Sequence, residues 1–324
     1  SMDTRWCVQG DSRRDVCHKG IETVSFGGKK MKGSKKFKKG ITIFSFLLPS
    51  LLAFSIFSIF SIGYSFFLSF TDWDIITEPN FVGLSNYSNI LHSEEFWKIL
   101  GNTLYYMVLY IPLIIIFSIG VAMLLNVKSK ATGVFRTIFF IPVLTSWVAA
   151  AMLWRWLLSP YYGPINAILQ VFGIPGPSWL YDSVWAMPAI VLASLWKDVG
   201  FFGLIFLSGL QSIDPAYYEA AEIDGASKFQ RFRKITLPLL SPTIFFVLII
   251  TSINSFQLFP QVMIMTQGGP FGSTEVFMER IYSYAFKYYE MGYASAYSWI
   301  LFVFIFVFTI LQWTLQKRWV YYEA

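Results

Sequence analysis

Charged residues are scarce in this chain. Of its 324 residues, 14% are Asp, Glu, Lys or Arg, whereas 55% are hydrophobic and 19% are aromatic. Soluble domains carry about 25% charged residues. The deficit excludes an ordinary soluble globular protein and predicts a membrane protein, because side chains that face lipid can be apolar as well as those that are buried.

Cysteine, histidine and nucleotide-binding glycine motifs are also scarce or missing. Cys7 and Cys17 both lie in a polar leader, which excludes a disulfide scaffold. His18 and His92 are far apart and have no acidic or sulfur partners at ligand spacing, so we expect no metal site and no Ser/His/Asp arrangement. The phosphate-loop pattern G-x-x-x-x-G-K-S/T does not occur. We therefore expect no catalytic residues and no ATP hydrolysis on this chain.

Six apolar stretches are long enough to cross about 30 Å of hydrocarbon as helices. The expected spans lie near residues 42–70, 100–126, 135–158, 184–210, 239–264 and 294–316. The sequence thus predicts an all-α membrane protein, with a six-span transmembrane domain at residues 42–318. A leader at residues 1–41 precedes this domain, and a short tail at residues 319–324 follows it.

Basic residues predict the orientation, because Lys and Arg are retained on the cytoplasmic side of a membrane. Of the 25 Lys and Arg, 11 lie in residues 1–41, and residues 211–238 and the tail hold more. The loops expected on the opposite side of the membrane hold only Lys98, Arg280 and Lys287. We expect both termini to be cytoplasmic. The net charge of +6 then reflects topology, and no nucleic-acid partner is expected.

The leader allows two interpretations that its residues do not separate. Met31 opens a basic run directly before the first expected span, which favours Met31 as the natural start and residues 1–30 as a non-native extension. Residues 27–30 would then be the translated image of a purine-rich ribosome-binding site. Alternatively, residues 1–41 form a disordered, basic cytoplasmic leader.

The loop at residues 211–238 has the composition of a helical hairpin. Asp214 and Pro215 form a helix-start pair, and Gly225 permits the left-handed turn that ends a helix. Residues 229–237 begin a second helix before the fifth expected span. Charges of both signs and several aromatic side chains make this hairpin a candidate docking surface.

The same loop carries a spaced motif. The pattern E-A-A-x3-G-x9-I-x-L-P is met by Glu219, Ala220, Ala221, Gly225, Ile235, Leu237 and Pro238. It resembles the signature loop of the membrane subunits of binding-protein-dependent ABC importers. From about Phe81 to its end, the chain resembles the carbohydrate-uptake branch of that family, which contains maltose, multiple-sugar, alginate and glycerol-phosphate permeases. The stretches 81–87, 135–142, 266–270 and 292–296 carry this wider resemblance.

The resemblance implies a type I importer-like permease that crosses a bacterial cytoplasmic (inner) membrane several times. It implies a second homologous permease, two ATP-binding cassette subunits that hold ATP and Mg²⁺, an extracytoplasmic solute-binding protein and a carbohydrate substrate. No cofactor is expected on this chain itself. Residues 219–225, Asp224 included, would form the coupling helix that docks in an ATPase subunit. The glycine-rich loop at residues 267–272 would approach the binding protein.

An ion-coupled secondary sugar transporter is the alternative. Such a carrier is expected to show internal repeats and membrane carboxylates. The sequence shows no convincing repeat, and Asp198 is the one acid well inside an expected span. A membrane-embedded enzyme would need a cluster of reactive side chains, which the sequence lacks. Both observations favour the importer.

Amide side chains form a stripe in the fifth expected span. Asn254, Gln257 and Gln261 are spaced i, i+3 and i+7 and would share one face of a continuous helix. Amides suit a sugar, because each offers a donor and an acceptor to hydroxyl groups. They equally suit hydrogen bonds to neighbouring helices, and the residues alone do not separate the two roles.

A charged pair interrupts the fourth expected span. Lys197 and Asp198 are neighbours on a helix and do not face one another. Lys197, with Phe201 on its side, is a candidate contact for an anionic substrate such as a uronate oligosaccharide or glycerol phosphate. Asp198 could equally answer a cation across the heterodimer. Trp196 and Phe256 lie near these polar residues and are candidate platforms for a sugar ring.

Overall fold

The computed structural model describes residues 33–127 and 132–321 of the chain. The start expected at Met31, and with it the choice between an extension and a basic leader, lies outside these residues. By its contacts the chain divides into two compact units, Ser1–Phe60 and Ser61–Ala324. The domain boundaries expected from the sequence stay predictions.

The first unit contributes one helical segment to the described structure. Helix α1 (Gly33–Phe54) is followed by a π-helical turn at Ser55–Phe60. Its apolar side chains, such as Phe46 and Phe57, are exposed. Such exposure of large apolar side chains is expected where the surroundings are lipid or another subunit.

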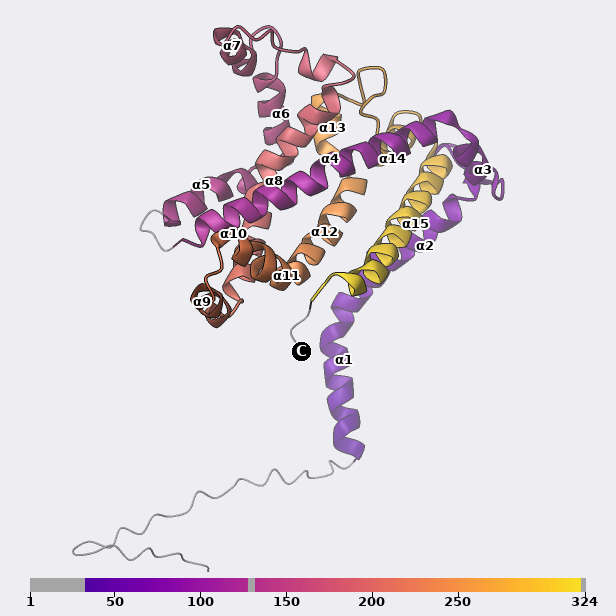
Figure 1. Cartoon of the computed structure of the whole chain (residues 1–324). Helices are drawn as coiled ribbons and strands as arrows, with labels where there is room; N and C mark the ends of the chain where they lie inside the picture. Colours follow the sequence, from indigo (N-terminus) through magenta and orange to yellow (C-terminus); the bar gives the residue numbers. More distant parts are fainter. Residues whose placement is uncertain (1–32, 128–131, 322–324) are drawn as a thin grey trace, which may run out of the picture. The chain divides into compact units, whose positions relative to one another are not determined.

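The second unit is built from helices (Figure 1). Its two short strands, β1 (Thr71–Asp72) and β2 (Asn80–Phe81), pair antiparallel. The helices of its first half are α2 (Ser61–Leu68), α3 (Ser85–His92), α4 (Glu94–Leu125), α5 (Thr132–Leu144), α6 (Trp147–Leu157) and α7 (Pro164–Val171). Those of its second half are α8 (Ala186–Gln211), α9 (Pro215–Ile223), α10 (Lys228–Arg231), α11 (Leu237–Leu239), α12 (Ser241–Phe256), α13 (Pro260–Met265), α14 (Phe277–Phe286) and α15 (Met291–Leu315). Short 3₁₀ turns occupy Trp179–Tyr181 and Gln316–Arg318, and a π-helical turn occupies Phe232–Thr236.

The core of the second unit lies between α4 and α8, which run side by side in Figure 1. An apolar 18-residue window is 61% buried in α8 and 44% buried in α4, against 33% in the segment Met291–Arg318. Gly200 lets α8 approach α5 closely, because a Cβ at this position would clash with the carbonyl oxygen of Phe139. Helix α8 is therefore the most deeply buried of the long apolar helices, and it packs against α4, α5, α6, α12 and α13.

Four helical segments are long and apolar enough to cross a membrane, and they overlap the first, second, fourth and sixth expected spans. They are Thr42–Leu68, Glu94–Leu125, Ala186–Gln211 and Met291–Arg318. The third expected span is a bent pair of helices, and the fifth overlaps the second helix of another bent pair, Lys228–Leu239 and Ser241–Phe256. The described residues thus offer four to six spans, and the count of six stays a prediction.

The two bends have local causes. Helices α5 and α6 meet at 99°, and the Ser146 hydroxyl caps α6 by accepting a hydrogen bond from the Ala149 N–H at 3.2 Å. The pair Lys228–Leu239 and Ser241–Phe256 is bent by 63°, and Pro242 lies in the first turn of its second helix, where a missing N–H is tolerated. The first bend lies inside the third expected span, where hydropathy gives no sign of it, whereas the second coincides with the expected start of the fifth.

Candidate functional site

A break between α12 and α13 positions the three amides. Helix α12 ends at Phe256 and α13 begins at Pro260, whose ring nitrogen has no N–H to continue a helix. The continuous helical face expected for Asn254, Gln257 and Gln261 is therefore wrong, because only Asn254 lies inside α12 and the helix ends just before Gln257. All three side chains nevertheless line one cavity.

This cavity, which we term the amide cavity, has a volume of about 290 Å³. Its walls come from α4, α8, the start of α6 and the α12–α13 break. The lining residues are Tyr106, Tyr110, Trp147, Asp198, Asn254, Ser255, Gln257, Leu258, Pro260 and Gln261. Amides, a carboxyl group and aromatic rings thus converge on one space, as in sites for small polar molecules.

Asp198 is the acid of the amide cavity. Tyr110 donates its hydroxyl to Asp198 Oδ2 at 2.8 Å, and the Tyr106 ring stacks on the Tyr110 ring with centroids 5.2 Å apart. Both tyrosines are buried, so the carboxylate is oriented from α4. The sequence reasoning missed these two residues. Their i, i+4 spacing in an apolar span was the available signal.

Gln261 contributes a buried amide to the amide cavity. Its side chain is 7% exposed, yet its Oε1 has no hydrogen-bond partner among the described residues. A buried acceptor left unpaired costs about 1–3 kcal/mol. Asn254 and Gln257 are exposed at the same cavity and offer further amide groups.

Lys197 does not line the amide cavity. It is buried, and its Nζ donates to three backbone carbonyl oxygens at the end of α5. These are the carbonyls of Pro142 at 3.3 Å, Val143 at 3.2 Å and Thr145 at 2.8 Å. An ammonium group has three donors, so these acceptors use its full capacity. The expectation that Lys197 contacts an anionic substrate is at odds with this arrangement.

The aromatic side chains expected near the pathway also lie outside the lining of the amide cavity. Phe256 is buried and packs edge-on against a ring of α15, with centroids 5.6 Å apart. Trp196 contacts Trp154 in the same way at 6.0 Å, and Phe201 is 45% exposed. The indole that does line the cavity is that of Trp147, which the sequence reasoning missed.

The hairpin expected at residues 211–238 is present as α9 to α11. Asp214 caps α9 by accepting a hydrogen bond from the Ala216 N–H at 2.9 Å. Gly225 ends this helix at φ +74°, and Ser227 opens the second arm with a capping box. The local structure expected from the sequence is confirmed, while the side of the membrane on which it lies stays a prediction.

The residues of the spaced motif divide into two groups. Glu219, Ala220, Asp224 and Gly225 are exposed, whereas Ala221, Ile235, Leu237 and Pro238 are partly buried. The two arms are braced against each other, since Arg231 pairs with Glu222 at 3.1 Å. Tyr218 and Thr236 share a further hydrogen bond of 3.0 Å. The hairpin therefore exposes the acids Glu219 and Asp224 at its tip, while contacts between its two arms stabilise the rest.

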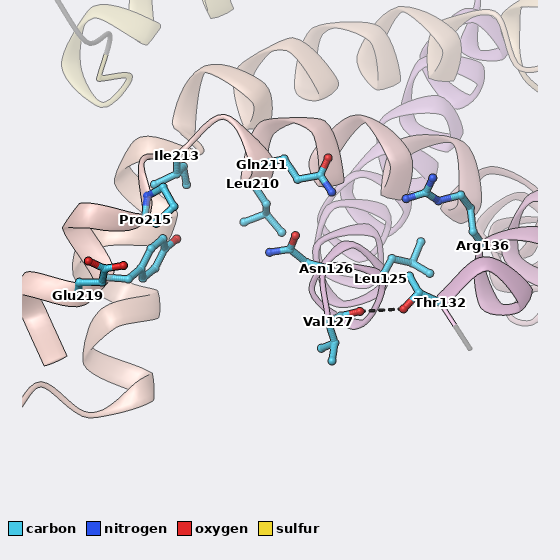
Figure 2. A pocket seen from close by; sticks show the side chains of 11 residues that line it. Leu125, Asn126, Val127, Thr132, Arg136, Leu210, Gln211, Ile213, Pro215 and Glu219 are labelled. Atoms are coloured by element: carbon cyan, nitrogen blue, oxygen red, sulfur yellow. Dashed lines mark hydrogen bonds between the residues drawn. The ribbon is translucent and has the colours of Figure 1, made fainter. Parts of the chain in front are cut away.

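A second cavity, of about 600 Å³, lies beside the hairpin. Its lining comes from the ends of α4 and α8, the start of α5 and the first turns of α9. Figure 2 shows Glu219 and Pro215 at one side of this cavity and Arg136 at the other. The motif thus offers a partner both an exposed surface and a hollow next to it.

The glycine-rich loop at residues 267–272 is fastened to α4. Lys98 donates to the Phe271 carbonyl at 2.8 Å, and Asn102 donates to the Gly272 carbonyl at 2.9 Å. The Phe271 side chain is 93% exposed. The loop therefore exposes the Phe271 ring, while hydrogen bonds from Lys98 and Asn102 fix its backbone.

An ion cluster lies beneath this loop. Arg280 pairs with Glu95 and, at 3.3 Å, with Glu275. Burial acts against the charge of Arg280, but the attraction of these two carboxylates outweighs it and raises the pKa of Arg280. Burial also raises the pKa of Tyr284, whose hydroxyl donates to Glu95 at 2.6 Å. Arg280 therefore stays charged at neutral pH, and its ion pairs give the loop a stable base.

Comparison with known proteins identifies the class of the molecule. The chain belongs to the family of binding-protein-dependent transport system inner membrane components, whose model matches residues 87–321. It is 36% identical over 304 residues to the probable ABC transporter permease protein YesP of Bacillus subtilis, covering 92% of this chain and 98% of the relative. It is also 36% identical over 279 residues to the trehalose/maltose transport system permease protein MalF of Thermococcus litoralis, covering 85% and 93%.

Solved structures agree on the fold. A bacterial ABC transporter involved in the import of the acidic polysaccharide alginate matches with a TM-score of 0.78 and 26% identity, over 88% of this chain and 98% of that chain. The alginate transporter in complex with an alginate pentasaccharide-bound periplasmic protein matches with a TM-score of 0.76 and 26% identity, over 88% and 96%. The mostly helical importer-permease fold expected from the motif is confirmed. Membership of this family decides against an ion-coupled secondary carrier.

Proposed function

We propose that this chain is a permease subunit of an ATP-driven, binding-protein-dependent carbohydrate importer, and that it forms half of the translocation pathway. The family match over residues 87–321 carries this proposal, together with relatives named for maltose, trehalose and alginate transport. A second, homologous permease supplies the other half of the pathway. Two ATPase subunits hold ATP and Mg²⁺, and a solute-binding protein delivers the saccharide.

The amide cavity is the part of the pathway that this chain supplies. Its amides and the unpaired Gln261 Oε1 match the donors and acceptors of saccharide hydroxyl groups. Within the described residues its lining includes Asp198 and no lysine or arginine. This half of the pathway therefore favours a neutral saccharide, and a uronate or glycerol phosphate would need its cation from the second permease.

The α9–α11 hairpin is the coupling element. Its exposed tip, with Glu219, Ala220 and Asp224, docks in a groove of an ATPase subunit, and the small alanine side chain permits close approach. With both termini cytoplasmic, six spans place this hairpin on the cytoplasmic side. On the other side, Phe271 and its loop contact the solute-binding protein.

Transport follows from linkage between these parts. ATP binding closes the ATPase pair, the docked hairpins move with it, and the two permeases rock so that the amide cavity changes its side of access. The ATPase partner carries out hydrolysis, and this chain transmits the movement. The contacts between the two arms of the hairpin make it rigid, so that a displacement of its tip is transmitted to α8 and α12.

Reconstitution into vesicles tests the proposal. The chain is assembled with the second permease, the ATPase subunits and the binding protein, and uptake of labelled maltose, trehalose and alginate oligosaccharide is measured. We expect uptake of at least one of these that requires both ATP and the binding protein. Uptake that runs on a sodium or proton gradient without ATP would refute the importer.

A further inference from the structure

The break between α5 and α6 interrupts the helical pairing of backbone carbonyls. The Pro142 carbonyl accepts locally from the Thr145 N–H at 3.2 Å and the Thr145 hydroxyl at 2.6 Å, and those of Val143 and Thr145 lie beside it. Helix α5 ends at Leu144, and the last four carbonyls of an α-helix have no partner further along it. In an apolar setting each unpaired carbonyl is costly. A sharp break inside an apolar pair of helices therefore needs a donor from elsewhere in the protein.

Lys197 supplies this donor from α8. Its Nζ reaches three carbonyls of the break, of which that of Thr145 is nearest at 2.8 Å. A positive charge at the C-terminal end of a helix is also favourable. Gly200, about one turn further along α8, allows the close approach of α5 at Phe139. Together these contacts fasten the break to the central helix.

The same ammonium group lies over the ring of Trp147, the first residue of α6. Its Nζ is 5.2 Å from the ring centroid, within the range of a cation–π interaction. Trp147 lines the amide cavity, whereas Lys197 does not. Successive residues on a helix point about 100° apart, so Asp198 faces the cavity while Lys197 faces the break.

We propose that Lys197 is a positioning residue that holds the Trp147 indole in place as a platform for the saccharide ring. This inference rests on the proposed function. A saccharide ring has apolar C–H faces, and a flat indole beside amides and a carboxylate complements them. A side chain fixed in advance by a buried cation loses less rotamer freedom when a ligand binds.

A double-mutant cycle in the whole reconstituted transporter tests the inference. Uptake of maltose, trehalose and alginate oligosaccharide is compared in the unmodified protein, Lys197→Met, Trp147→Leu and the double variant. We expect each single change to lower the maximal rate about tenfold, and the double change to lower it no further. The binding-protein concentration for half-maximal uptake stays the same, because the outer loops are untouched. Lys197→Arg keeps the cation and retains most of the rate.

Losses that multiply in the double variant would overturn the inference, because Lys197 would then act without Trp147. Trp147→Leu leaves the lysine–carbonyl contacts in place, so it assembles even where Lys197→Met does not. Unchanged uptake in Trp147→Leu, with normal uptake by the unmodified transporter, overturns this inference alone. If the unmodified transporter takes up none of the three saccharides with ATP, the proposed function fails and this inference with it.

Discussion

The amide cavity and the α9–α11 hairpin use polar groups in opposite ways. In the cavity, Asp198 is held by a buried tyrosine that lies 88 residues away in the sequence, and Gln261 is 7% exposed. In the hairpin, the acids are exposed, and Arg231 and Glu222, which brace its arms, are nine residues apart. The cavity is therefore formed by helices that are far apart in the sequence, whereas the hairpin is stabilised by residues that are close in the sequence.

This difference explains which partner each region can serve. A buried polar group is costly until it is satisfied, so the cavity responds to a single small molecule that brings the missing donors. Exposed charges are individually worth little, so the hairpin has to act through its shape against a large partner. Variants should therefore affect transport through chemistry in the cavity and through backbone geometry in the hairpin.

The largest effect is expected for Gly225→Val. Gly225 has φ +74°, which a β-branched residue does not adopt without strain of about 1–3 kcal/mol, so the reversal at the hairpin tip is lost. We expect saccharide-stimulated ATPase activity to fall by about tenfold or more. The matched control is Gly225→Asn, because asparagine tolerates this conformation. Normal stimulation in the valine variant would show that the turn is not needed for coupling.

A smaller effect is expected for Gln261→Leu. The change removes an amide whose Oε1 is buried without a partner, so a net hydrogen bond of about 1 kcal/mol to substrate is lost and uptake falls about fivefold. The melting temperature should stay the same or rise, because the unpaired oxygen is gone. Unchanged uptake would show that Gln261 makes no hydrogen bond to the transported saccharide.

Phe256→Leu distinguishes the cavity from the core beside it. Phe256 is 2% exposed and packs on Phe308, so the change should lower the free energy of unfolding by about 1 kcal/mol. Uptake per assembled transporter should remain near that of the unmodified protein. A strong loss of uptake at normal stability would restore Phe256 as a substrate platform.

The smallest effect is expected for Glu222→Gln in the hairpin. The Glu222 side chain is 71% exposed, so its ion pair with Arg231 stabilises by at most about 1 kcal/mol and weakens further with salt. Coupled ATPase activity should change less than twofold. A loss comparable to that of the valine change at Gly225 would contradict the view that the hairpin acts through its backbone.

The local structure of the hairpin could be predicted from the sequence, because its signals act over a few residues. Asp214 caps the first helix, and Gly225 reverses the chain. The amides were predicted to share one face of a helix. They do line one cavity, but through a helix break before Pro260 and not through a continuous face. A spacing of i, i+3 and i+7 does not reveal where a helix stops.

The contacts of Lys197 and Trp147 could not be predicted in the same way. The lysine binds carbonyls more than 50 residues away, at the break where α5 and α6 meet at 99°. The mean hydropathy of a segment predicts that it lies in a membrane, but it does not show where the helix bends. The same holds for Tyr110, whose partner Asp198 is brought to it by the packing of α4 on α8.

The central claim is that the amide cavity is the saccharide pathway, and protection of an introduced thiol tests it most directly. In a background with Cys7→Ser and Cys17→Ser, the change Gln257→Cys is made in the cavity and, as the control, Val184→Cys is made at an exposed position before α8. Maleimide labelling is timed in the assembled transporter with and without the transported saccharide. We predict that the saccharide slows labelling at position 257 severalfold and leaves labelling at position 184 unchanged. Labelling at position 257 that is indifferent to a saccharide the transporter still takes up would contradict this account.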